Sequence, residues 1–133
     1  MTDSDFNIVE FLEETIASDE QYLIRLKCLY DNVADRYHLF GRKHMWVVQS
    51  DVSRSFAGEV KNSDNFALRY DATECRIFMS KKEAVALKEA FEEAELAVSV
   101  VDYLDAIGAE IDSVKKSIPE TKKALLNAQE MAA

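Results

Sequence analysis

The middle of the chain interleaves basic and aromatic residues in a way that suits the binding of a flat anionic ligand. An aromatic ring can stack on a nucleobase while a guanidinium pairs with phosphate. The candidate ligand-binding residues are Arg36, His38, Arg42, Trp46, Arg69 and Tyr70. They predict a nucleotide pocket, which we expect at a subunit interface. The alternative is a structural use, because Tyr37 fits the apolar stripe of its own helix and Arg42 and Lys43 suit the C-terminal end of that helix.

A second candidate site consists of acidic residues at helical spacing in the C-terminal half. These residues are Glu92, Glu95, Asp102, Asp105 and Asp112. Like charges repel along a helix by about 0.2–0.5 kcal/mol per pair, so a regular acidic stripe favours a functional reason. Carboxylates at regular intervals can imitate a phosphate backbone and enter a basic groove of another protein. We therefore predict a partner-binding acidic face. The alternative is a solvated face that keeps a small protein soluble.

No motif in the chain indicates catalysis or a bound metal. The sequence lacks the GxSxG, HExxH, P-loop and dinucleotide patterns, and its three glycines leave little room for loops that cradle phosphate. Two histidines and two cysteines are of the types that bind zinc, but their spacing matches no recognised site. These four residues are Cys28, His38, His44 and Cys75. We expect no catalytic residues, no metal, no cofactor and no enzymatic activity, and we expect both cysteines to be buried, reduced thiols.

Helical patterns dominate the N-terminal half. Ile8, Phe11, Leu12 and Ile16 form the apolar side of a short amphipathic helix. The segment 18–21 has the spacing of a capping box, so we expect a second helix to begin there and to end at Gly41. Residues 44–56 fit either structure, since Met45, Val48, Val52 and Phe56 follow helical steps whereas Trp46-Val47-Val48 suits a strand. We favour the helix.

The C-terminal half predicts a hairpin followed by a long helix. Residues 66–79 contain two alternating apolar runs around a turn, which predicts a β-hairpin. Apolar residues then recur in steps of three or four over 81–116, and Pro119 predicts a break near 117–119. The fold class is therefore expected to be α+β and predominantly α-helical, with one domain over residues 1–133.

Charge and hydropathy limit the partners. The net charge is −9, and residues 1–20 hold seven acids and no base, whereas residues 21–80 hold seven acids and nine bases. An acidic surface repels phosphate backbones, so nucleic acid is an unlikely partner and a basic protein surface is favoured. No apolar run approaches the roughly 20 residues that span a bilayer. Residues 1–6 lack the basic start and apolar core of a signal peptide. We expect no membrane association and a cytoplasmic location.

These patterns predict a non-enzymatic acidic binding protein that inhibits or regulates another macromolecule. By general analogy, small acidic proteins of this kind are often accessory, anti-defence proteins of phages or mobile elements. The alternative is an oligomeric protein that binds or sequesters a nucleotide or another small molecule. A third hypothesis is a chaperone-like or assembly subunit, because a helical segment, a hairpin and a long C-terminal helix resemble prefoldin subunits in architecture alone. A long amphipathic helix needs other helices to cover it, so we expect a homo-oligomer formed through the C-terminal helix.

Overall fold

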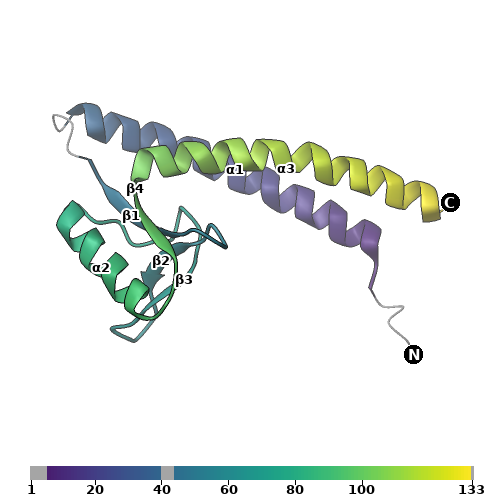
Figure 1. Ribbon diagram of the computed structural model, residues 1–133. Coiled ribbons are helices and arrows are strands. Elements are labelled where there is room, and N and C mark those ends of the chain that lie inside the picture. The colour runs from purple at the N-terminus through teal and green to yellow at the C-terminus, as the bar shows by residue number, and fades with distance from the viewer. Residues whose placement is uncertain (1–5, 40–43, 133) are drawn as a thin grey trace.

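The computed structural model of the chain describes residues 6–39 and 44–132, and in them three helices and four strands (Figure 1). In chain order they are α1 (Ile8–Leu39), β1 (Trp46–Ser50), β2 (Phe56–Glu59), β3 (Phe66–Tyr70), α2 (Lys81–Glu93), β4 (Val98–Asp102) and α3 (Tyr103–Ala132). The strands form one antiparallel sheet in the order β3-β2-β1-β4. The expected α+β, predominantly helical fold with a long C-terminal helix is confirmed. No helix in these ranges is long and apolar enough to cross a membrane.

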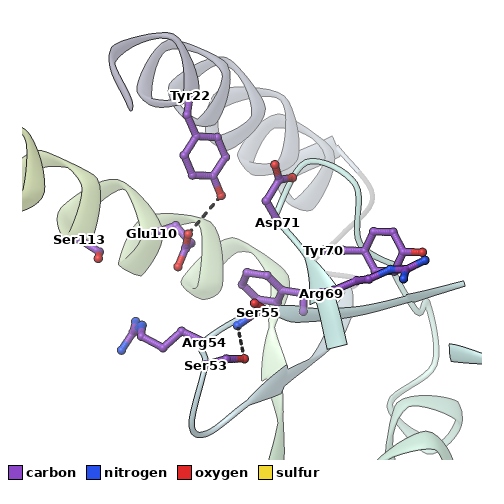
Figure 2. Close-up of a pocket in the computed structure, with 10 residues that line it drawn as sticks. Tyr22, Ser53, Arg54, Ser55, Arg69, Tyr70, Asp71, Glu110 and Ser113 are labelled. Carbon is purple, nitrogen blue, oxygen red and sulfur yellow. Dashed lines mark hydrogen bonds between the residues drawn. The ribbon is translucent and has the colours of Figure 1, made fainter. Parts of the chain in front are cut away.

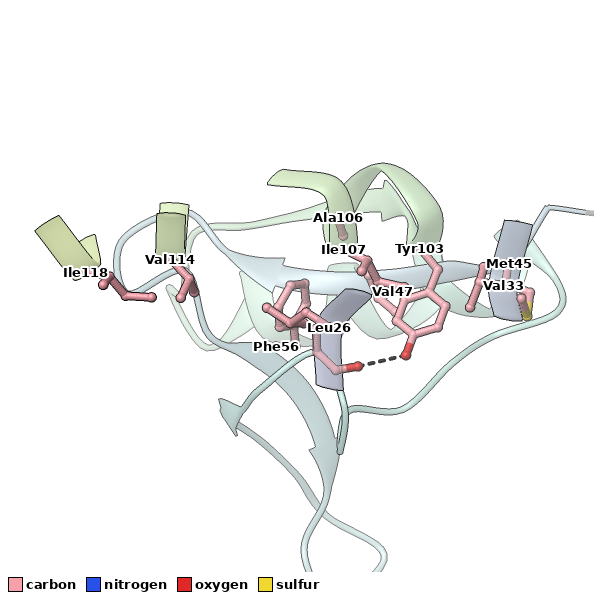
Figure 3. Close-up of a cluster of buried hydrophobic side chains, with 11 residues drawn as sticks. Leu26, Val33, Met45, Val47, Phe56, Tyr103, Ala106, Ile107, Val114 and Ile118 are labelled. Carbon is pink, nitrogen blue, oxygen red and sulfur yellow. Dashed lines mark hydrogen bonds between the residues drawn. The ribbon is translucent and has the colours of Figure 1, made fainter. Parts of the chain in front are cut away.

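Helices cover both faces of the sheet (Figure 1). Side chains alternate along a strand, so Val47 and Val48 of β1 point to opposite faces, and both are fully buried. Val47 belongs to the larger core, which α1 and α3 close (Figure 3). Val48 belongs to a smaller core with Phe91 of α2. The sheet is thus the middle of three layers, and β1 has no solvent-facing side.

The helices α1 and α3 run antiparallel and extend past the sheet, so that the start of α1 and the end of α3 lie on the same side of the molecule (Figure 1). Contacts show this direction, since Tyr37 meets Asp102, the residue before α3, whereas Tyr22 meets Glu110 and Glu20 meets Lys122 farther along α3. We call residues 8–20 with 115–132 the arm. The arm has a small core, because Ile16 and Ile118 are its buried large apolar side chains and the others keep part of their surface exposed. The arm is a two-helix projection with much apolar surface left uncovered.

The predicted division of the N-terminal half into two helices is wrong, because α1 is continuous from Ile8 to Leu39. Asn7 is the actual cap, and its Oδ1 accepts the backbone N–H of Glu10 at 3.1 Å. Ser18 lies on the exposed side of α1. An apolar stripe packed on α3 runs past it, so the capping-box spacing at 18–21 does not start a helix.

The preference for a helix over residues 44–56 is also wrong. Residues 46–50 form β1, and a turn follows in which Ser50 Oγ accepts the backbone N–H groups of Val52 and Ser53. Arg54 takes a left-handed conformation (φ 64°) before β2 begins. A strand that is buried on both faces reads as a continuous apolar run instead of an alternating one, which removes the usual strand signal.

The predicted helix over 81–116 is three elements: α2, β4 and the start of α3. The helix does begin at Lys81, but it ends in a Schellman motif, in which Leu96 N–H donates to Phe91 O and Glu95 N–H donates to Glu92 O. Glu95 occupies the left-handed position of this motif (φ 64°). The valine-rich strand β4 then pairs residue by residue with β1. The valines of this segment recur in steps of three and of two, so they fit the period of a helix and the period of a strand. Pairing with β1 makes the segment a strand.

The predicted break at 117–119 does not occur, because α3 runs through Pro119 to Ala132. A proline removes one backbone hydrogen bond from a helix interior. Two contacts hold this segment in place: Ile118 is buried, and Thr121 Oγ1 donates to Ser117 O at 3.0 Å. Tertiary packing on α1 therefore outweighs the local preference.

The predicted hairpin over 66–79 has the wrong second strand. β3 pairs with β2 instead of with residues 75–79. Within 75–79, Phe78 makes a single bridge with Trp46. Asp71 turns the chain away, because its Oδ1 accepts the backbone N–H of Thr73 at 2.8 Å. Gly58 lies in β2 under the ring of Tyr70, where a Cβ would collide with the ring carbons. The hairpin is β2–β3.

Candidate functional site

Two of the predicted residue sets meet in one pocket of about 420 Å³ at the junction of the sheet and the helix pair. The residues that line it are Tyr37, His44, Trp46, Asp102, Leu104 and Asp105. They come from the end of α1, the start of β1, the end of β4 and the first turn of α3. Trp46 belongs to the predicted ligand-binding set, and Asp102 and Asp105 belong to the predicted acidic face. We call this the junction pocket.

Asp102 organises the junction pocket. Its Oδ2 lies 2.7 Å from His44 Nδ1 and accepts the hydroxyl of Tyr37 at 3.1 Å. Its Oδ1 accepts the backbone N–H of Asp105 at 3.1 Å, so Asp102 is the N-cap of α3. Tyr37 in turn accepts the backbone N–H of Met45 at 3.0 Å. Burial raises the pKa of Tyr37, and the negative charge of Asp102 adds to the increase.

The pocket offers aromatic rings on which a planar ligand could stack. The imidazole of His44 is half exposed, and its ring lies 6.0 Å from that of Trp46. Lys81 Nζ already lies 4.9 Å from the centre of the Trp46 ring, where a cation is attracted to the ring face. None of the described residues lining the pocket is a serine, threonine, cysteine or lysine. The lining residues offer aromatic rings for stacking and polar side chains for hydrogen bonding.

We predict that Asp102→Ala lowers the free energy of unfolding by about 1–2 kcal/mol, because it removes the cap of α3 and the acceptor of Tyr37. The measurement is a urea unfolding midpoint at neutral pH. Asp105→Ala is the matched control, because Asp105 is exposed, and we expect a change within about 0.5 kcal/mol. Equal effects of the two substitutions would contradict the structural role of Asp102.

A second pocket, of about 370 Å³, lies between the helix pair and the turn that joins β1 to β2 (Figure 2). Tyr22 donates its hydroxyl to Glu110 Oε2 at 3.1 Å across the pocket. Burial raises the pKa of Tyr22, and the charge of Glu110 raises it further. Arg69 and Tyr70 line this pocket, yet Figure 2 shows their side chains directed away from Tyr22 and Glu110.

The predicted ligand-binding residues are therefore dispersed. Arg36 and His38 are exposed near the end of α1, and Arg42 lies outside the described residues. Trp46 lines the junction pocket, whereas Arg69 and Tyr70 line the second pocket, where the Arg69 guanidinium lies 5.6 Å from the Tyr70 ring centre. The structure does not gather the described members of this set into one nucleotide pocket.

The predicted acidic residues do not form one helix face either. Glu92 lies in the last turn of α2, where its carboxylate is 3.6 Å from Lys88 Nζ, Glu95 lies in the turn after α2, and Asp112 is exposed on α3. Asp102 is committed to internal hydrogen bonds, and Asp105 lies in the first turn of α3. Their spacing reads as one stripe only if residues 81–116 are a single helix. Partner binding by these residues stays a prediction.

The sequence reasoning missed a third surface, at the N-terminal end of α1. Residues 6–21 contain five acids and no base, and the acids are Glu10, Glu13, Glu14, Asp19 and Glu20. Phe6 and Phe11 are 64 % and 49 % exposed, and their ring centroids lie 5.6 Å apart. A pocket of about 230 Å³ beside Phe11 is lined by Glu14, Thr15, Ser18 and Asp19. The sequence signal that could have identified this surface is the absence of basic residues from 1–20. We call residues 6–20 the acidic end of α1.

The cysteines and histidines form no metal centre among residues 6–39 and 44–132, where no three His, Cys, Asp or Glu side chains gather closely enough. Cys28 is exposed on α1, so the expectation of a buried thiol is wrong there. Cys75 is partly buried and its Sγ lies 3.6 Å from Ala72 O. Burial raises the pKa of Cys75 to about 12, which keeps this thiol protonated and unreactive.

Comparisons of the chain with protein-family models, with curated proteins and with solved structures find no significant match. A function has to be inferred from the residues and geometry described above.

Proposed function

We propose that this protein is a non-enzymatic binding protein that presents the acidic end of α1 to a basic surface of another macromolecule and thereby inhibits or regulates it. The observation that carries the proposal is the combination of two features on one helical segment. The segment contains five carboxylates and no basic residue, and the large apolar side chains of Phe6 and Phe11 are exposed among them. Charge alone would suit a solvated surface, but exposed phenylalanines at the same place mark a contact surface.

The position of Phe11 explains why it is exposed. Phe11 precedes Tyr22 by eleven residues, about three helical turns, so the two side chains project from nearly the same side of α1. Tyr22 packs on the sheet side, where its hydroxyl accepts the backbone N–H of Ala72. The N-terminal end of α1 extends beyond the sheet (Figure 1). Phe11 stays 49 % exposed there, next to the ring of Phe6 and the shallow pocket. A partner surface would take the place of the sheet.

The two features supply different parts of binding. Uniform negative charge attracts a basic partner over several ångströms and raises the association rate, an effect that salt weakens. Burial of an exposed phenylalanine contributes about 1.5–3 kcal/mol once contact is made. Together they favour a basic surface that contains an apolar cleft, and they disfavour a bare phosphate backbone.

Affinity capture from an extract of the source cells tests the proposal, with bound protein identified and quantified by mass spectrometry. We predict that Glu10→Lys with Glu14→Lys abolishes capture of the partner, and that Phe11→Ala reduces it roughly tenfold, which corresponds to about 1.4 kcal/mol. Added salt should release the partner from the unchanged protein.

The matched control is Glu92→Lys with Glu95→Lys, which makes the same charge change at the residues predicted from sequence. We expect this control to retain the partner. Loss of capture in the control and retention in the Glu10/Glu14 variant would move the binding site to the end of α2 and refute the proposed surface.

A further inference from the structure

The strand β4 lies at one edge of the sheet, because it is the last strand in the order β3-β2-β1-β4. Among the described residues no strand pairs with the side of β4 that faces away from β1. Val98 is buried, and the other residues of β4 are partly exposed. An edge strand presents a row of backbone N–H and C=O groups with which another chain can pair. We call the outer side of β4 the open edge.

Two hydrogen bonds at the ends of β4 show which of its backbone groups point to the open edge. Just before β4, Ala97 O accepts the backbone N–H of Asp51 at 3.0 Å, and just after β4 the N–H of Tyr103 donates to the residue before β1 at 2.8 Å. In an antiparallel pair, residues that bond to the neighbouring strand alternate with residues that do not. The odd-numbered residues from 97 to 103 therefore bond towards β1. The even-numbered residues, whose backbone N–H groups point to the open edge, are Val98, Val100 and Asp102.

The open edge lacks the devices that usually prevent an edge strand from pairing. In the described chain no turn, cap or side chain accepts a hydrogen bond from these three N–H groups. The opposite edge of the sheet is protected, since β3 carries the exposed Arg69 and its pairing with β2 shifts register between Phe56 and Ala57. β4 contains no lysine, arginine, proline or glycine, and it pairs with β1 without a shift. A regular, valine-rich edge of this kind suits the addition of a further strand.

The two faces of the sheet beside the open edge differ in chemistry. Val98 and Val100 face α2, because they belong to the smaller core or pack against it. Ser99 faces the opposite way, and its Oγ donates to Asp51 Oδ1 at 2.6 Å. Asp51 is exposed, and neither it nor Glu95, just before β4, is in an ion pair within the described part of the chain. A strand laid along the open edge therefore places one row of side chains beside valines and the other row near an exposed carboxylate.

We propose that the open edge binds an extended segment of another protein in which basic and apolar side chains alternate. The added strand accepts hydrogen bonds from the outward N–H groups, and its apolar side chains lie beside Val100. A lysine opposite Ser99 is long enough to reach the Asp51 carboxylate. A second copy of this chain fits the edge less well, because pairing of two β4 strands about Val100 sets Val101 opposite Ser99 and supplies no cation to Asp51. Each copy also carries a net charge of −9, so the two repel each other.

The open edge is separate from the surface assigned under the proposed function. It belongs to the sheet, whereas the acidic end of α1 extends beyond the sheet (Figure 1). Binding at the open edge therefore holds or fails independently of partner binding by Phe11 and its neighbouring carboxylates.

An NMR titration of the isotope-labelled protein with short synthetic peptides tests the proposal. A peptide of alternating lysine and valine is expected to shift the amide signals of Val98 and Val100 saturably, whereas a peptide of alternating glutamate and valine is not. Asp51→Asn keeps an acceptor for Ser99 and should raise the Kd of the lysine peptide roughly twofold to fivefold, as expected for an exposed ion pair. Asp112→Asn, which removes an exposed carboxylate from α3, is the matched control and should leave the Kd unchanged.

Val100→Pro tests the role of the backbone, because it removes an outward N–H and leaves the bonds to β1 in place. We expect this variant to keep its unfolding midpoint and to lose peptide binding. N-methylation of the peptide backbone makes the same test on the unaltered protein and should also abolish binding. Absence of saturable shifts in β4, or equal binding of the glutamate peptide, would overturn the proposal. A free protein that sediments as a dimer and protects the Val98 and Val100 amides from hydrogen exchange would assign the open edge to a second copy instead.

Discussion

Replacing Tyr103 with alanine is expected to lower the free energy of unfolding by about 3–5 kcal/mol, enough to unfold a marginally stable domain of this size. Tyr103 is 2 % exposed and belongs to the larger core (Figure 3). Its hydroxyl donates to Ala72 O at 2.7 Å, and its backbone N–H donates to Met45 O at 2.8 Å. The residue therefore connects the start of α3 to the sheet. The measurement is chemical denaturation monitored by circular dichroism.

Tyr103→Phe separates the ring from the hydroxyl. It keeps the packing but leaves the buried Ala72 carbonyl with the weak Cys75 thiol as its side-chain donor, so we expect a loss of about 1–2 kcal/mol. A continuous helix over 81–116 would place Tyr103 beside the apolar stripe instead of on it, and alanine would then have little effect. Equal unfolding midpoints for the alanine and phenylalanine variants would contradict the described junction between β4 and α3.

Stability is expected to fall as pH rises above about 9, because several buried groups resist ionisation in the folded state. Burial raises the pKa of Cys75 from 9.0 to about 12 and raises the pKa of Tyr103, with further increase from the charges of Cys75 and Asp71. The unfolded chain releases these protons first, so it binds fewer protons than the folded chain and the slope is negative. The thiol contribution is complete below pH 9 and is lost towards pH 12, by at most about 1.4 kcal/mol per pH unit.

Cys75→Ser is the matched control, since it removes the titrating thiol with a small change in shape. Between pH 9 and 10 the tyrosines of the unfolded chain begin to ionise as well, so the thiol supplies only part of the loss. We expect the unfolding free energy of both proteins to fall across this window under reducing conditions, and to fall more steeply for the wild-type protein than for the variant. Parallel curves for the two proteins would show that Cys75 is not buried in the folded state.

Local patterns were sufficient for the elements whose boundaries are set by local chemistry. The apolar spacing identified helical character in the segments that form α1 and α3, and the predicted start at Lys81 is correct for α2, although Ser80 makes no side-chain cap hydrogen bond. Turn-forming residues lie in 60–65, between β2 and β3. These features, with the acidic balance of residues 1–20, sufficed for the fold class and for a preference for basic partners.

The candidate surfaces could not be predicted from local patterns, because they depend on contacts between distant parts of the chain. Asp102 read as one member of an acidic stripe, but pairing of β4 with β1 brings it to Tyr37 and His44, which occupy its carboxylate. Phe11 read as one member of an apolar stripe, but it is 49 % exposed in the structure. Neither fact is visible in the periodicity of one segment.

Side-chain periodicity and charge are local properties, so they are enough to predict an acidic α+β protein dominated by amphipathic helices. Contacts between distant segments make Val98–Asp102 a strand, bury β1 inside the sheet and allow α3 to pass through Pro119. Valines at 98, 100 and 101 fit a helix or a strand almost equally well. Hydrogen bonding to β1 and burial against α2 settle the matter, since a short apolar segment takes the conformation in which its neighbours satisfy its backbone.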